Sequence, residues 1–71
     1  MNARQIVGKN MREFRVAAGL SQGDVAKRMD VEQTYVSGLE RGVRNPTLTT
    51  LERAAAALDV TIVDLLRPPA S

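Results

Sequence analysis

The chain has 71 residues, of which 44% are hydrophobic, with a formal net charge of +2 and no cysteine or histidine. A chain of this length forms one small domain that buries only about 60% of the surface exposed by its unfolded form. The missing residue types exclude disulfides, thiolate nucleophiles, zinc-finger ligand sets and imidazole acid–base chemistry, so we expect no enzyme, no metal and no cofactor.

Positive charge is concentrated in the first part of the chain. Residues 1–28 sum to +4, whereas residues 29–71 sum to −2. A basic half indicates a polyanionic partner on one side of the protein, or simply a well-solvated helix surface. The apolar runs are far shorter than a membrane span, and the first ten residues lack the hydrophobic segment of a signal peptide. We therefore expect a cytoplasmic protein with no membrane partner.

The first two predicted helices have clear start and stop signals. Asn2 is a good N-cap for a helix of about four turns, which Gly19 ends. Ser21, followed three residues later by Asp24, is a shortened capping box that begins a second helix running to about Met29. The positions predicted to be buried are Ile6, Val7, Met11, Phe14 and Ala18 in the first helix, and Val25, Ala26 and Met29 in the second.

Three further helices are predicted. A turn at Asp30 leads into the stretch VEQTYVSGLERG, a third helix over about residues 32–41 that Gly42 ends. A fourth helix begins after Thr47, and a fifth, IVDLL, is capped by Thr61 and must end before the prolines of the tail RPPAS. The positions predicted to be buried in the fourth helix are Leu48, Leu51, Ala55 and Leu58.

These elements predict a compact all-α domain over residues 1–67 with a short tail over residues 68–71. The second and third helices, each about eight to ten residues long and separated by a short turn, have the spacing of a helix-turn-helix. In that motif the first helix crosses the DNA backbone and the second enters the major groove.

The third predicted helix has two unlike faces. Its apolar side holds Val36 and Leu39, with Tyr35 at the edge. The positions of the opposite side are Gln33, Thr34, Ser37 and Arg41. An ordinary solvated helix more often carries Glu and Lys there, whereas Gln, Thr and Ser can donate to and accept from base edges without repelling phosphates. The pattern favours a surface that reads DNA.

The stretch GLSQGDVAKRMDVEQTYVSGLERGVRNPTLTTLERAAAALDV resembles the phage-repressor and Cro-type (Xre) helix-turn-helix family. The resemblance covers residues 6–66, with GLSQ opening the second helix, YVSGLERG ending the third, NP before the fourth and LDV before the fifth. Within the family, TYVSGLERG is similar to small controller proteins of restriction-modification systems. The resemblance implies a lambda-repressor-like fold and a sequence-specific transcriptional regulator, repressor or activator, that binds double-stranded DNA in a bacterial or phage nucleoid.

The resemblance also implies roles for single residues. Gln33, Thr34 and Ser37 match base-reading positions, where Gln suits adenine and the Thr methyl group suits a thymine methyl group. Gln22 matches a phosphate-binding position at the start of the second helix, where the helix dipole favours an anion, although it is also a capping position. Tyr35 either lends its hydroxyl group to a phosphate or is merely a half-buried core residue.

Arg15 and Glu40 match a pair that ties the first helix to the recognition helix in related repressors, and a forked contact between them would fix the angle of that helix. The rival pairing joins Glu40 to Arg44, but Gly42 ends the helix between them. The cations that fit phosphate contacts, or are simply solvated, are Arg12, Arg41 and Arg44.

Four residues depart from the family pattern. Asp30 and Asp59 stand where the family usually has Gly after a helix, a position that needs a positive φ and that Asp tolerates at some cost. Glu32 replaces the usual Ser or Thr at the N-cap of the recognition helix. Gly38 lowers helix propensity by up to about 1 kcal/mol relative to Ala. Reading DNA does not by itself explain Glu32 or Gly38.

The fifth predicted helix is apolar almost all round. Its apolar residues are Ile62, Val63, Leu65 and Leu66. So short a helix cannot bury all of them in its own domain, so we expect a homodimer through this helix and the end of the fourth. The dimer would bind a pseudo-palindromic operator with half-sites about 34 Å apart.

Two other functions remain open. An antitoxin of a toxin–antitoxin pair would also bind its own operator, but the tail RPPAS looks short for binding a toxin. A protein-interaction domain would use the same fold without DNA, and a mainly acidic face on the third helix would favour it. We expect no small-molecule ligand, because no effector domain fits after residue 66.

Overall fold

The computed structural model describes residues 1–69 and contains five helices and no strand in that range. The helices are α1 (Ala3–Ala17), α2 (Gln22–Met29), α3 (Gln33–Glu40), α4 (Leu48–Leu58) and α5 (Ile62–Leu66). The predicted all-α class and the predicted order of helices are confirmed. Of the predicted tail, residues 70–71 lie outside the described part of the chain.

Local hydrogen bonds explain where the helices begin. Ser21 Oγ accepts from the backbone N–H of Asp24 at 3.0 Å, and the Asp24 carboxylate accepts from the backbone N–H of Ser21 at 2.9 Å. Thr61 and Asp64 form the same reciprocal box at the start of α5. The backbone donors hold the pKa of both carboxyl groups below its usual range. By contrast, Glu32, which stands at the N-cap position of α3, forms no side-chain cap.

Left-handed residues end the helices at the predicted positions. Gly19 follows α1 with φ of 72°, and Gly42 follows α3 with φ of 75°. Asp30 after α2 and Asp59 after α4 have φ values of 58° and 57°. Because a left-handed residue turns the chain sharply, each of these four helices gives way to a short connection.

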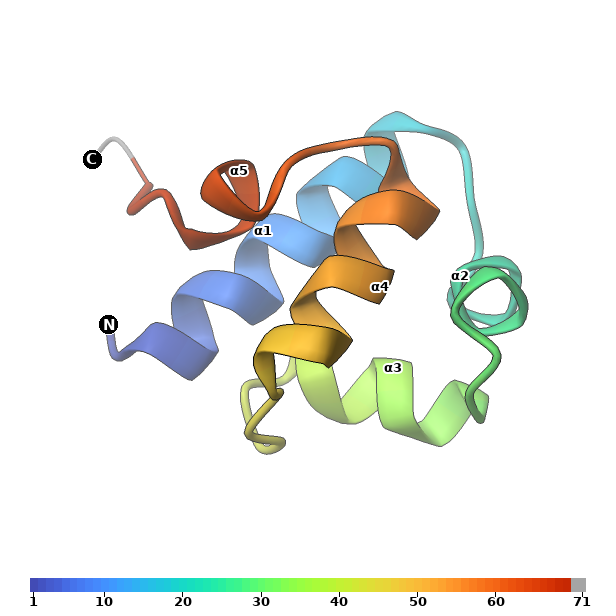
Figure 1. The fold of residues 1–71 in the computed structure, drawn as a ribbon, viewed down its shortest axis with the longest axis horizontal. Coiled ribbons are helices and arrows are strands. Elements are labelled where there is room, and N and C mark those ends of the chain that lie inside the picture. Colours follow the sequence, from blue (N-terminus) through green and yellow to red (C-terminus); the bar gives the residue numbers. More distant parts are fainter. Residues whose placement is uncertain (70–71) are drawn as a thin grey trace.

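The core forms where α1 and α4 pack with the other three helices. In Figure 1, α3 lies along the lower edge and α5 at the upper left, and α1 packs against both. The buried apolar residues are Val7, Met11, Val25, Ala26, Met29, Val36, Leu39, Leu51, Ala54, Ala55, Ala57, Leu58 and Leu65. Ile6 and Phe14 are only partly buried.

Two predicted core positions are wrong. Leu48 is 71% exposed, because it is the first residue of α4 and has no preceding turn to hold it against the core. Ala18 is exposed as the C-cap residue of α1, where the helical stripe has already ended. Both errors arise at helix ends, where periodicity is a poor guide to burial.

A buried asparagine joins α1 to α5. Asn10 is 7% exposed, and its side-chain amide donates to the backbone oxygens of Leu65 and Arg67, both at 2.8 Å, and of Asp64 at 3.4 Å. The C-terminal carbonyls of a helix have no partner within the helix, so Asn10 satisfies groups that would otherwise be left without one. Nothing in the hydrophobic pattern predicts this contact.

Across the described residues, none of the helices has the length and apolar character needed to cross a bilayer.

Candidate nucleic-acid interface

The two helices of the predicted motif differ sharply in direction. In Figure 1, α2 is seen end-on while α3 runs across the lower edge of the molecule. Val36 and Leu39 are 0% and 1% exposed and fix the inner face of α3 in the core. The opposite face of α3 is consequently turned away from the rest of the domain.

The outer face of α3 carries the predicted base-reading residues. Gln33 and Thr34 are exposed, and Ser37 is half-buried. All three are uncharged and can donate as well as accept hydrogen bonds. The structure thus brings them together on one side of α3, within the first five residues of the helix.

Arg15 and Glu40 form the predicted ion pair. Arg15 Nε donates to Glu40 Oε2 at 2.6 Å and Nη2 donates to Oε1 at 3.1 Å, while Nη1 donates to the backbone oxygen of Leu20 at 3.0 Å. The two side chains are 14% and 5% exposed. Hydrogen bonding to Glu40 raises the pKa of Arg15 above its ordinary value. The pair therefore links the end of α1 to the end of α3.

Gln22 joins this network. Its Nε2 donates to Glu40 Oε1 at 3.1 Å. A Gln amide group has two N–H donors, so one remains for another acceptor beside the N-terminus of α2. The predicted phosphate-binding residue is thus held in place by the same carboxylate that binds Arg15.

A glycine on α1 lets the backbone of α3 approach closely. A Cβ atom added to Gly8 would overlap the backbone oxygens of Leu39 and Glu40, and neither backbone atom can move aside cheaply. Sequence reasoning missed this contact. The signal was a glycine inside the buried stripe of a helix, directly after Val7.

The rival pairing of Glu40 with Arg44 does not form. Arg44 instead lies over Tyr35, with its guanidinium carbon 5.7 Å from the ring centroid. Tyr35 is half-buried. Its role as a phosphate ligand and its role as a core residue both stay predictions, because a half-buried ring can pack on the core and still expose its hydroxyl group.

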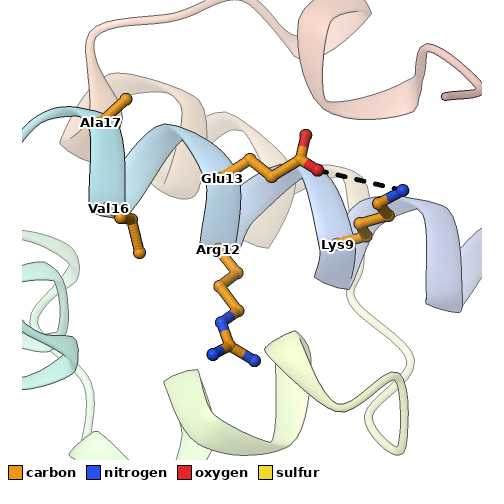
Figure 2. Close-up of a pocket in the computed structure, with 5 residues that line it drawn as sticks. All are labelled: Lys9, Arg12, Glu13, Val16 and Ala17. Atoms are coloured by element: carbon orange, nitrogen blue, oxygen red, sulfur yellow. Dashed lines mark ion pairs between the residues drawn. The ribbon is translucent and has the colours of Figure 1, made fainter. Parts of the chain in front are cut away.

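Further cations lie beside the C-terminal end of α3. Figure 2 shows Arg12 extending from α1 toward α3, while Lys9 and Glu13 pair with each other at 3.9 Å. An open depression of about 320 Å³ lies on the surface beside the contact of α1 with the end of α3, and Arg12 and Arg41 both line it. The larger depression drawn in Figure 2 lies over exposed side chains of α1 alone.

The predicted dimer surface on α5 needs one correction. Val63 and Leu66 are 65% and 42% exposed, whereas Ile62 is partly buried against the core. Leu65 is 0% exposed, so its predicted place in a dimer interface is wrong. The reason is that α5, although apolar almost all round, still turns one side chain fully into the core. Two exposed apolar residues remain available to a partner.

A family model described as helix-turn-helix matches residues 11–65 of the chain. The uncharacterized HTH-type transcriptional regulator y4dJ of Sinorhizobium fredii is 46% identical over 68 residues, which are 96% of this chain and 88% of the relative.

Two solved structures are similar in fold and sequence. A hypothetical transcription factor from Neisseria has a TM-score of 0.91 at 43% identity, covering 96% of this chain and 78% of that one. The restriction-modification controller protein C.AhdI from Aeromonas hydrophila has a TM-score of 0.84 at 39% identity, covering 87% of this chain and 94% of that one. The similarity therefore extends over most of the chain and is not limited to α2 and α3.

Proposed function

The chain belongs to the helix-turn-helix family of DNA-binding transcriptional regulators, which are not enzymes. From this membership we propose that the protein recognises a specific operator by placing α3 in the major groove. The uncharged side chains on the outer face of α3 carry the proposal: Gln33 and Thr34 are exposed and Ser37 is half-buried. Gln33 can pair through two hydrogen bonds with adenine, and the Thr34 methyl group can pack on a thymine methyl group. Ser37 adds a hydroxyl group one turn further along.

Phosphate contacts surround this face. Gln22 has one amide N–H beyond its bond to Glu40, and it is the first residue of α2, where the helix dipole favours an anion. Arg41 and Arg44 flank the C-terminal end of α3, with Tyr35 beneath Arg44, and Arg12 of α1 lines the depression beside the same end. Such contacts set the position of the protein on the duplex without specifying sequence.

A homodimer through α5 completes the proposal. Val63 and Leu66 supply its exposed apolar side chains, with Ile62 at the edge. A two-fold dimer would place two copies of α3 in successive major grooves about 34 Å apart, which requires a pseudo-palindromic operator. Because C.AhdI is described as a restriction-modification controller protein, we propose a controller-type regulator that responds to its own concentration, without a small-molecule ligand.

Selection of bound sequences from random duplex DNA tests this function directly. The expected result is a pseudo-palindromic motif. Gln33→Ala should then weaken binding to the selected operator by about 1–3 kcal/mol and leave random DNA nearly unaffected, while Arg44→Ala weakens both and lowers the salt slope by about 1. Equal losses on both DNAs for Gln33→Ala would remove it from the base-reading set. Failure to enrich any motif would refute sequence-specific binding.

The dimer has its own test. Val63→Asp places a charge on the proposed interface, so sedimentation at tens of micromolar should change from dimer to monomer. Glu52→Asp, a conservative change at an exposed position of α4, serves as the control. A wild-type protein that sediments only as a monomer, with no effect of Val63→Asp, would refute the dimer.

A further inference from the structure

Gly38 is the residue of α3 that base reading does not explain. It is buried in the middle of the helix, where glycine is unfavourable because it loses more backbone freedom than alanine. A Cβ atom added to Gly38 would lie 2.7 Å from Arg44 Cγ, 3.4 Å from Nε and 3.6 Å from Cδ. The space that a side chain at position 38 would fill is therefore occupied by the aliphatic stem of Arg44.

The same arginine reaches Tyr35 with its charged end. The guanidinium carbon lies 5.7 Å from the centroid of the Tyr35 ring, a distance at which a cation is attracted to the face of an aromatic ring. Tyr35 and Gly38 are three residues apart in α3, so they share one face of the helix. The Arg44 side chain thus runs along one turn of α3, with its stem over Gly38 and its guanidinium group over Tyr35.

We propose that Gly38 is a positioning residue, and that the hollow it leaves in α3 seats Arg44 so that its guanidinium group and the Tyr35 hydroxyl group form a preordered phosphate-binding unit. The inference rests on the proposed DNA-binding function and names a device within it. A free arginine loses much rotamer freedom when it binds, whereas an arginine already seated loses less. The hollow at Gly38 therefore increases the affinity for DNA and does not increase the free energy of unfolding.

This role is opposite to that of Gly8. A Cβ atom at Gly8 meets backbone atoms, so the fold itself requires that glycine. At Gly38 the obstructing atoms belong to a flexible side chain that starts in a loop. Gly38→Ala should therefore leave the fold intact and improve helix propensity, while it displaces Arg44 from the Tyr35 ring.

The test is a double-mutant cycle on operator binding, with Gly38→Ala, Arg44→Ala and the double variant titrated by fluorescence anisotropy at several salt concentrations. Gly38→Ala should weaken binding to the selected operator about two- to fivefold, with a melting temperature equal to or above that of the wild type. In the Arg44→Ala background the same change should have no further effect. Wild-type affinity in Gly38→Ala, or equal losses in both backgrounds, would overturn the proposal.

A DNA-free measurement separates this proposal from the proposed function. Tyr35 is the only tyrosine and the chain has no tryptophan, so the ring resonances in NMR spectra report directly on the cation above them. Gly38→Ala and Arg44→Ala should shift these resonances in the same direction and by similar amounts. If the resonances shift but the wild type prefers no DNA sequence, the packing of Arg44 over Gly38 and Tyr35 is correct and the proposed DNA-binding function is wrong. Unshifted resonances in Gly38→Ala would refute the proposal that Gly38 positions Arg44.

Discussion

One guanidinium group, that of Arg15, links α1, the turn before α2 and the end of α3. It donates twice to the Glu40 carboxylate, at 2.6 and 3.1 Å, and once to the backbone oxygen of Leu20. We predict that Arg15→Met, which keeps much of the aliphatic stem, lowers the free energy of unfolding by about 3 kcal/mol at neutral pH. The reason is that the Glu40 carboxylate stays buried with Gln22 as its remaining side-chain donor.

Burial sets the size of this effect. Removing one partner of a buried ion pair costs about 3–5 kcal/mol, whereas an exposed pair contributes about 0–1 kcal/mol. The Arg15 side chain is 14% exposed and that of Glu40 is 5% exposed, which places the pair near the lower end of the buried range. A domain of 71 residues has a total stability of about 4–10 kcal/mol, so the loss is a large fraction of the whole.

Urea unfolding followed by far-ultraviolet circular dichroism measures the loss. Arg67→Met is the matched control, because Arg67 pairs with Asp64 at 3.3 Å but its side chain is 65% exposed. The control should lose less than about 1 kcal/mol. Equal, small losses in both variants would show that the Arg15–Glu40 pair stabilises no more than an exposed pair, and the reasoning from burial would be refuted.

The double variant Arg15→Met/Glu40→Met separates stability from orientation. Apolar residues of similar volume often replace a buried ion pair without loss of stability, so the free energy of unfolding should be close to that of the wild type. If the pair also fixes the angle of α3, operator binding should stay weak in this stable protein. Recovery of both properties would limit the pair to a role in stability.

Three further predictions concern contacts within the domain. Asn10→Ala removes the amide that serves the end of α5 and should lower the free energy of unfolding by about 1–3 kcal/mol in urea; an unchanged midpoint would contradict the contact. Gly8→Ala should cost about 1–3 kcal/mol or more through overpacking against the α3 backbone, and a wild-type melting temperature would show that α3 can shift freely. The folded-state pKa values of Asp24 and Asp64 lie below their unfolded values, so their stabilisation is present above the unfolded pKa and is lost as pH falls through the folded pKa. Melting temperature should therefore fall as pH drops below the ordinary Asp pKa of about 4, and the variant Asp24→Asn/Asp64→Asn should flatten that fall; an equally steep fall in the variant would assign the acid sensitivity to other groups.

Local chemistry made the helix boundaries predictable. The capping residues Ser21 and Asp24 are three residues apart, and the left-handed residues lie directly after their helix (Asp30) or one residue later (Gly42). Interactions this short depend on the residues themselves and not on the fold, so the sequence specifies them. Burial at Leu48 could not be predicted in the same way, because it depends on what lies beside the first turn of α4.

Contacts between residues far apart in the sequence were harder to predict than helix boundaries. Asn10 meets the end of α5 at a separation of 55 residues, and Gly8 meets the end of α3, and no periodicity connects either pair. Arg15 and Glu40, 25 residues apart, were paired only through the family resemblance. The packing of Arg44 over Gly38 was not predicted at all, since it depends on the path of the loop after α3.

The placement of Gly8 and Asn10 shows how the reading surface and the proposed dimer surface are related. Successive residues of an α-helix are rotated by about 100°, so residues two apart point to nearly opposite sides. Gly8 receives the end of α3, and Asn10 binds the end of α5. α1 is thus held by the proposed reading helix on one side and by the proposed dimer helix on the other. The distance between the two copies of α3 in the proposed dimer therefore depends on these two contacts with α1, although neither residue faces DNA or the partner.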